Sequence, residues 1–189
     1  MGRTVNPQVT VVIPYHTARE QNGMLARAVR SVEAQTVPCE IVQAKDVHGM
    51  GAAITRNHGL ALVKTPWTAF LDSDDEMDSD HVEKLLRCAE ETGADYVYPW
   101  FRVVGGSDPF PMFFGRPWND NAPHSTTITI LIRTELAKRM GFQSIPSEDF
   151  NFTLRCMNER AKIVHLPERT WTWHHHGKNT SGRSGIGDA

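Results

Sequence analysis

The chain has 189 residues, of which 40% are hydrophobic and 22% are charged. This mixture is typical of a globular protein that buries its own core, and it excludes an intrinsically disordered chain. The 20 Lys and Arg residues nearly balance the 22 Asp and Glu residues, so the net charge is −2, which excludes a global electrostatic attraction to nucleic acid or to an anionic membrane.

Targeting and redox signals are absent from the sequence pattern. No apolar run reaches the ~20 residues that a membrane-spanning helix needs, and residues 1–8 lack the apolar core of a signal peptide. The 3 cysteines are far apart and form no Cys-x-x-Cys pair. We therefore predict a soluble, cytoplasmic protein without a transmembrane segment, with reduced thiols in or near its core.

The first half of the chain alternates between strand and helix patterns. Four short β-branched or aromatic runs predict strands, at residues 9–14, 40–44, 67–71 and 95–99. Between them, apolar residues at helical spacing predict helices, at residues 23–35, 51–63 and 78–91. The alternation is typical of an α/β fold with a mostly parallel sheet covered by helices on both faces. Ligands of such sheets bind at the carboxyl ends of the strands.

The second half is less regular. Residues 104–124 are rich in Gly and Pro and predict a long loop that carries several exposed aromatic side chains. Beyond it we predict a strand at 126–132, a helix at 134–140, a helix at 148–158 with Ser147 as its N-cap, and a last strand at 161–166. The remaining residues, from 167 onward, predict a tail with a fraying Gly/Ser-rich end.

Asp72 and Asp74 follow the third predicted strand, at the ligand-binding edge of the sheet. Residues i and i+2 of an extended chain project to the same side, so both carboxylates can face one point. Paired carboxylates suit Mg²⁺ or Mn²⁺, which prefer oxygen ligands and leave positions open for substrate phosphates. The alternative is a solvated acidic turn at the start of the next helix, but the apolar strand that leads into the cluster favours a metal site.

Four segments between residues 9 and 99 resemble the nucleotide-binding half of glycosyltransferase family 2. They are Val11-Val-Ile-Pro14, Ala28-Val-Arg-Ser-Val-Glu-Ala-Gln35, Gly51-Ala-Ala-Ile-Thr-Arg-Asn-His-Gly-Leu60 and Phe70-Leu-Asp-Ser-Asp-Asp75. The last matches the family's Asp-x-Asp motif. The resemblance implies a GT-A fold, with a Rossmann-like nucleotide-binding half and a smaller acceptor half. It also implies metal-dependent, inverting transfer of a sugar from a nucleotide-diphosphate sugar to an acceptor hydroxyl.

By this likeness, Asp72 would lie near the donor ribose and beside the metal, and Asp74 would hold the Mn²⁺ or Mg²⁺ ion that bridges the diphosphate, with Asp75 as a helper. Arg56 would meet phosphate oxygens or the base. Asn57 would support the local backbone.

Pro14 and Tyr15 end the first predicted strand, where Tyr15 either stacks on the nucleobase or is an ordinary surface residue. The sequence departs from the family after the second strand. Lys45-Asp46-Val47-His48 stands where two aspartates followed by Gly-Ser are usual. Asp46 is the candidate base contact, and the departure leaves the identity of the nucleotide open.

Ser147-Glu148-Asp149-Phe150 resembles the family's Glu-Asp motif. The resemblance implies that Asp149 is the general base that takes the proton of the acceptor hydroxyl, and that Glu148 orients or contacts the acceptor. The alternative is that both carboxylates only stabilise the start of a helix.

The tail carries His174-His175-His176, followed by Gly177 and Lys178. Neighbours on a strand alternate sides, so only His174 and His176 can share a face. The resemblance implies that one histidine completes the metal or diphosphate site, and we favour His176 over His174, with a mobile tail as the alternative. Lys178 could neutralise phosphate charge.

Four aromatic residues could form a stacking platform for an acceptor sugar: Trp171, Trp173, Trp118 and Phe114. Core packing explains Trp171 equally well.

We expect one catalytic domain over residues 1–189, in which residues 9–99 bind the nucleotide sugar, residues 100–166 bind the acceptor and residues 167–189 close the site. The acceptor itself is left open between a glycan, a protein, a small molecule and a modified nucleobase.

Three rival functions are weaker. A sugar-1-phosphate nucleotidyltransferase needs a Gly-rich, basic loop directly after the first strand, and residues 14–20 contain no glycine. A catalytically inactive binding module would be expected to have lost Asp72, Asp74 or Asp149, all of which are present. A zinc hydrolase would need a His-x-x-x-His motif or matching Cys pairs, and the chain has neither.

Overall fold

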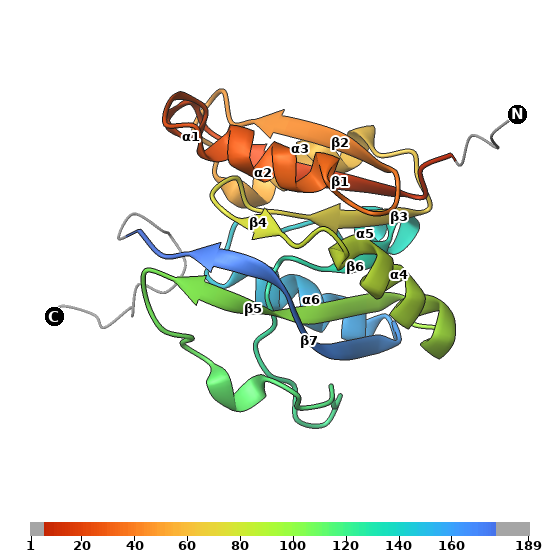
Figure 1. The fold of residues 1–189 in the computed structure, drawn as a ribbon. Helices are drawn as coiled ribbons and strands as arrows, with labels where there is room; N and C mark the ends of the chain where they lie inside the picture. The colour runs from red at the N-terminus through yellow and green to blue at the C-terminus, as the bar shows by residue number, and fades with distance from the viewer. Residues whose placement is uncertain (1–5, 177–189) are drawn as a thin grey trace, which may run out of the picture.

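A seven-stranded sheet with helices on both faces organises the chain (Figure 1). The computed structural model describes residues 6–176. The strands are β1 (Val9–Tyr15), β2 (Cys39–Lys45), β3 (Trp67–Phe70), β4 (Glu76–Met77), β5 (Tyr96–Val104), β6 (Leu131–Arg133) and β7 (Ile163–His174). They lie in the order β2-β1-β3-β6-β5-β7-β4.

The parallel arrangement predicted from the sequence holds for β2, β1 and β3, and for the pair β5–β7. The sheet as a whole is mixed rather than mostly parallel, because β6 runs antiparallel to β3 and β5, and β4 runs antiparallel to β7. The reason is the connection between β5 and β6. A crossover helix returns the chain in the same direction, whereas this long loop, which contains only the 3-10 turn η1 (Pro111–Phe113), brings it back in the opposite one.

The predicted helices are all confirmed, with small shifts at their ends. They are α2 (Met24–Glu33), α3 (Ala52–Leu62), α4 (His81–Thr92), α5 (Thr134–Met140) and α6 (Glu148–Asn158). The short helix α1 (Thr17–Gln21) and the two-residue strand β4 were not predicted. Both are too short to produce a periodic pattern of their own.

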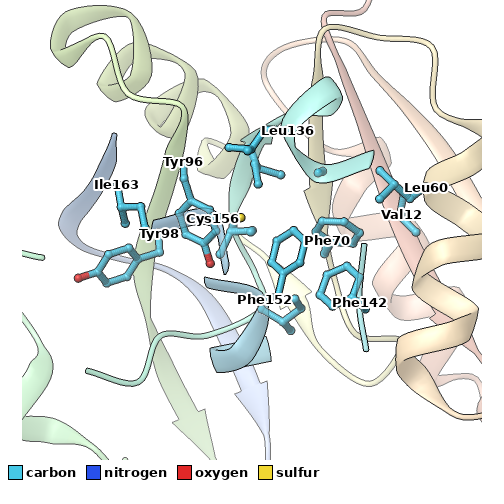
Figure 2. Packing of buried hydrophobic residues seen from close by; sticks show 14 of the residues in the cluster. Val12, Leu60, Phe70, Tyr96, Tyr98, Leu136, Phe142, Phe152, Cys156 and Ile163 are labelled. Atoms are coloured by element: carbon cyan, nitrogen blue, oxygen red, sulfur yellow. The ribbon is translucent and has the colours of Figure 1, made fainter. Parts of the chain in front are cut away.

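The sheet is buried on both faces, as the apolar strands require. On one face Val11 and Ile13 of β1 pack with residues of α2 and α4, while on the other face Val12 packs with residues of α3, α5 and α6. Figure 1 shows α2 and α4 in front of the sheet and α3, α5 and α6 behind it. The buried residues on each face form one core cluster. In Figure 2, Phe70 lies with Phe142 and Phe152 in the cluster that contains Val12. This cluster attaches α6 to the sheet.

Two predicted details are wrong, and a third is right in position only. The last strand continues to His174 instead of ending at 166, so the start of the predicted tail is part of the sheet. Pro167 suggested an end, since proline lacks the N–H of a ladder bond, but it lies in the register shift between β7 and β5. The strand predicted at 126–132 is much shorter in the structure, where it is the three-residue β6 (Leu131–Arg133). Ser147 occupies the predicted N-cap position of α6, but it has a φ of 54° and its side chain makes no capping hydrogen bond.

The cysteines fit the predicted reduced thiols. Cys39, Cys88 and Cys156 are all free, and burial raises the pKa of Cys156 to about 12. Across residues 6–176, no helix combines the length and apolar character that crossing a bilayer requires.

His81, at the start of α4, is fully buried. Its Nδ1 lies 2.8 Å from Thr170 Oγ1 of β7, and among residues 6–176 its Nε2 has no hydrogen-bond partner. Burial lowers the pKa of His81 from 6.5 to about 4. The folded protein therefore holds this imidazole neutral in the range where the unfolded chain already binds a proton.

We expect this difference to make the free energy of unfolding fall as the pH drops from 6.5 towards 4, by about 3 kcal/mol at the lower end. Urea unfolding of wild type and His81→Asn at pH 7 and pH 4 measures it. The variant should lose less stability on acidification, whatever its stability at pH 7. His58→Asn, at an exposed position of α3, is the control and should follow wild type. An equal acid loss in His81→Asn and wild type would contradict the prediction.

Candidate functional site

The carboxyl ends of β1, β2 and β3 meet at one edge of the sheet, and the acidic segment 72–75 follows β3 there. Backbone bonds fix this edge: the Asp46 N–H donates to the Tyr15 carbonyl at 2.8 Å, and the Leu71 N–H donates to the Val12 carbonyl at 3.1 Å. Tyr15, Asp46 and the acidic segment are therefore neighbours, as expected from the strand order.

Two pockets open at this edge. The first has a volume of about 240 Å³ and is lined by Pro14, Tyr15, His16, Arg19, Asp46, Gly51, Ala52, Thr55, Arg56, Asp72, Ser73, Asp74, Asp75, Glu148 and Trp173. The second has a volume of about 810 Å³ and contains Asp149 in its wall, together with apolar residues such as Phe110, Ile128 and Ile145. Arg56, Asp72 and Glu148 line both pockets, so they form a common wall.

Arg56 organises this common wall. Its Nη2 donates to Asp72 Oδ1 at 2.7 Å and its Nη1 donates to Glu148 Oε1 at 3.0 Å. The arginine is 3% exposed, and its guanidinium also lies 5.5 Å from the ring centroid of Phe142. A buried guanidinium with two carboxylates is electrically compensated. Arg56 thus links α3, the β3 edge and the start of α6.

Asn57, next to Arg56, supports the backbone of another segment. Its Nδ2 donates to the Phe142 carbonyl at 2.8 Å, and its Oδ1 accepts the Phe142 N–H at 2.7 Å. The predicted support is therefore given to the chain before α6 rather than to its own helix.

Asp46 holds the turn that leads into α3. Its carboxylate oxygens accept the N–H groups of Met50 at 2.8 Å and of Gly51 at 2.9 Å. These backbone hydrogen bonds, that of Gly51 above all, lower the pKa of Asp46. Gly51 has a φ of 87°, a conformation that side chains disfavour. The predicted base contact therefore lines the first pocket as a fixed carboxylate.

Asp74 and His176 are brought together, and Arg19 lies against both. The Nε2 of His176 is 2.9 Å from Asp74 Oδ2. Arg19 places Nη2 2.8 Å from the same carboxylate oxygen and Nη1 2.8 Å from the same imidazole nitrogen. His174 contacts Glu76 instead, with Nε2 at 2.6 Å from Oε2. Of the two histidines weighed from the sequence, His176 is the one at Asp74.

Asp75 is 3% exposed and accepts the His174 N–H at 2.9 Å. Burial, with the neighbouring charges of Asp72 and Asp74, raises the pKa of Asp75 well above its ordinary value. Asp75 therefore lines the first pocket and also holds the β7 backbone beside the acidic segment.

Two of the three predicted metal ligands, Asp74 and His176, lie together and suit a divalent cation. The carboxylate of Asp74 and the imidazole of His176 have the ligand chemistry of Mn²⁺ and Mg²⁺ sites and lie within 2.9 Å of each other. Asp72 points to Arg56 instead. Within residues 6–176, no group of three or more His, Cys, Asp or Glu side chains is arranged to hold a metal ion. Asp74 and His176 are therefore the two side chains of the predicted ligand set that contact each other.

Asp149 lies one residue into α6, in the wall of the second pocket. Burial raises the pKa of Asp149, and the like charges of Glu148 and Asp72 add to this effect. Its Oδ1 accepts the Phe150 N–H at 2.7 Å. A carboxylate with a raised pKa is a stronger base when it is ionised. Asp149 thus lies next to the common wall, to which the adjacent Glu148 belongs.

The four candidate platform residues are not brought together. Trp171 is 4% exposed and packs on Phe101 in the core, whereas Trp173 lines the first pocket. Trp118 packs edge-on against Tyr98, and Phe114 lies under the guanidinium of Arg169. Core packing is therefore the correct reading of Trp171. Lys178 lies outside the described residues.

The sequence of residues 44–155 matches the family model of glycosyl transferase family 2, and this match covers more than half of the chain. The chain belongs to glycosyl transferase family 2. No curated protein matches the sequence.

Solved structures agree with this family 2 fold. S. aureus TarS 1-349 in complex with UDP has a TM-score of 0.77 and 17% identity over 89% of this chain and 60% of that one. The same protein in complex with UDP-GlcNAc has a TM-score of 0.78 and 15% identity over 91% of this chain and 60% of that one. The mannosyltransferase PcManGT from Pyrobaculum calidifontis, in complex with GDP-Man and Mn²⁺, has a TM-score of 0.72 and 12% identity over 93% of this chain and 59% of that one. The likeness shows the GT-A fold, and the chain spans about 60% of the length of these structures.

Arg19 is one of two basic residues beside Asp74 that the sequence analysis did not single out. It belongs to the segment after β1, where only the absence of glycine had seemed informative. A basic residue in the short helix α1, directly after the carboxyl end of β1, was the available signal, because the acidic segment begins at the same edge of the sheet. Arg27 of α2 was also missed, and its Nη2 donates to the Asp74 carbonyl at 2.5 Å.

Proposed function

We propose that the chain transfers a sugar from a nucleotide-diphosphate sugar to an acceptor hydroxyl, with inversion at the anomeric carbon. The observation that carries the proposal is the common wall: Arg56, Asp72 and Glu148 face two pockets at once. One pocket can then take the donor and the other the acceptor, so the two substrates meet across these side chains. Family 2 membership supports glycosyl transfer as the reaction.

The donor would bind in the first pocket. Pro14 and Tyr15 would contact the base, Asp46 would fix the turn beside it, and Arg56 with Asp72 would lie at the ribose and phosphates. This assignment is supported by the lining of the pocket, by the helix N-terminus of α3, which favours anions, and by TarS and PcManGT, whose structures hold UDP, UDP-GlcNAc and GDP-Man.

Asp74 and His176 would hold a divalent cation. When bound, Mn²⁺ or Mg²⁺ would neutralise charge on the diphosphate as it leaves. The PcManGT structure contains Mn²⁺, which supports a metal in this chain as well. Lys178, two residues beyond His176 in the sequence, would add a further positive charge.

The acceptor would bind in the second pocket. Asp149 would accept the proton of the attacking hydroxyl, and Glu148, held by Arg56, would orient the acceptor. A hydroxyl that attacks from this pocket, opposite the departing diphosphate, would give inversion. In this division residues 9–99 bind the donor and residues 100–166 bind the acceptor, and the segment from 167 closes the first pocket through Trp173.

A thermal-shift panel of UDP-, GDP-, CDP- and dTDP-sugars, each with and without Mn²⁺, tests the proposal. A ligand that binds only the folded state at 100 times its Kd adds about 2.7 kcal/mol to the stability, which for a chain of this size raises Tm by roughly 5–10 °C. We expect one donor class to give this rise, and only with Mn²⁺.

Asp74→Asn should lose the metal-dependent part of this rise, because the amide is a much weaker cation ligand. Glu90→Gln, at an exposed position of α4, should behave as wild type. The proposal would fail if no nucleotide sugar raised Tm, or if Asp74→Asn gave the full rise with Mn²⁺.

A further inference from the structure

We propose that the Arg19 guanidinium is the resident cation of the Asp74–His176 pair, and that a divalent cation must displace it in order to bind. Because it concerns the cation of the first pocket, the proposal rests on the function proposed above. It makes Arg19 a residue that sets how tightly the site takes a metal.

The Arg19 guanidinium makes a bidentate contact with Asp74 and His176. Arg19 sends one guanidinium nitrogen to Asp74 Oδ2 and the other to His176 Nε2, both at 2.8 Å. The planar guanidinium presents its N–H groups as a rigid fork, which suits two acceptors side by side. The two acceptors are 2.9 Å apart, and the Arg19 side chain is only 13% exposed. Arg19 is therefore held inside the site instead of lying on its rim.

Arg19 and a metal ion need the same lone pairs. A guanidinium is a donor only, so a hydrogen bond from Arg19 to His176 requires Nε2 to be the acceptor and the ring proton to be on Nδ1. In this tautomer Nε2 cannot also donate to Asp74 Oδ2, and Arg19 then bridges the two atoms. The Nε2 electron pair that accepts from Arg19 in this tautomer is the same pair that would bind a metal. The Asp74 carboxylate has further lone pairs, so the competition there is electrostatic: a guanidinium 2.8 Å from Oδ2 repels a divalent cation at the same oxygen. Occupation by Arg19 and by a divalent cation therefore exclude each other.

The helix that carries Arg19 can move at small cost. None of the five residues of α1 is buried, so a shift of this helix disrupts no core packing. Besides the two acceptors, the side chain contacts only the Met24 sulfur among the hydrogen-bond partners found for residues 6–176, at 3.0 Å. A displaced Arg19 also stays in the wall of the first pocket, which it lines.

The first test measures Mn²⁺ binding without any donor, from the electron paramagnetic resonance signal of free Mn²⁺. Removing a charge-assisted contact from each of two ligands should tighten binding in Arg19→Ala by about tenfold or more. Arg30→Ala is the matched control, because it removes the same charge from an exposed position of the neighbouring helix α2, and it should bind as wild type. Equal or weaker binding by Arg19→Ala would overturn the proposal.

The second test measures thermal unfolding with a chelator and at saturating Mn²⁺. Arg19→Ala should unfold at a lower temperature than wild type in chelator, and Mn²⁺ should raise its Tm by more than it raises that of wild type. Arg19→Gln, which keeps most of the side chain, should show the same trend if Arg19→Ala folds poorly. Equal Mn²⁺-induced rises in wild type and both variants would contradict the displacement.

Failure here and failure of the proposed function give different results. If wild type and Arg19→Ala bind Mn²⁺ equally while a nucleotide sugar still raises Tm, only the displacement is wrong. If no nucleotide sugar binds while Arg19→Ala still takes Mn²⁺ more tightly than wild type, the glycosyl-transfer proposal is wrong and the role of Arg19 stands.

Discussion

Replacement of Asp149 by Asn is expected to reduce the rate of sugar transfer by about 100-fold to 10,000-fold while donor binding stays at the wild-type level. The amide has the same shape but cannot take a proton from a hydroxyl. Its oxygen can still accept the Phe150 N–H that Asp149 accepts at 2.7 Å, so the start of α6 should keep its conformation. Because Asp149 lines the second pocket and not the first, the donor loses no contact.

The measurement is single-turnover transfer with the donor identified by the thermal-shift panel, together with the Tm rise that this donor causes. Glu159→Gln is the control, since this exposed residue follows the far end of the same helix, and it should retain the full rate. In wild type, the raised pKa of Asp149 predicts that the rate falls on acidification at a pH above the ordinary range of Asp. A variant that keeps more than a tenth of the rate would exclude Asp149 as the base.

Replacement of Phe152 by Ala should lower the free energy of unfolding by about 3–5 kcal/mol. Phe152 is 1% exposed, and its ring stacks on that of Phe142 with centroids 4.2 Å apart and planes at 14°. Phe70 of β3 lies edge-on to Phe142 at 5.1 Å, as Figure 2 shows. The three rings attach α6 to the sheet close to the edge where the acidic segment begins, so their loss leaves a cavity that the rigid sheet cannot fill.

Urea unfolding followed by circular dichroism measures this loss. Leu154→Ala is the matched control, because Leu154 belongs to the same helix but is only partly buried and lies outside the two core clusters. It should cost clearly less than Phe152→Ala. Equal losses in the two variants would mean that the aromatic cluster does not hold α6.

The sequence by itself determined most of the elements and the position of the acidic residues. The β-branched run of β1 and the apolar spacing of α4 are local patterns, and they predict structure because burial repeats with the period of the strand or helix. The same logic put Asp72 and Asp74 at the carboxyl edge of the sheet and Asp149 at the start of α6. These predictions needed only residues close together in the chain.

Only the tertiary structure decided which side chains meet. Asp72 pairs with Arg56, and Arg19 lies against Asp74 although its own segment held no signal other than its nearness to the end of β1. The continuation of β7 past Pro167, which brings His176 to Asp74, was equally hidden. The physical reason is that hydrogen bonds and ion pairs between distant segments depend on strand register and on the path of loops, and these are settled by packing of the whole chain rather than by any local period.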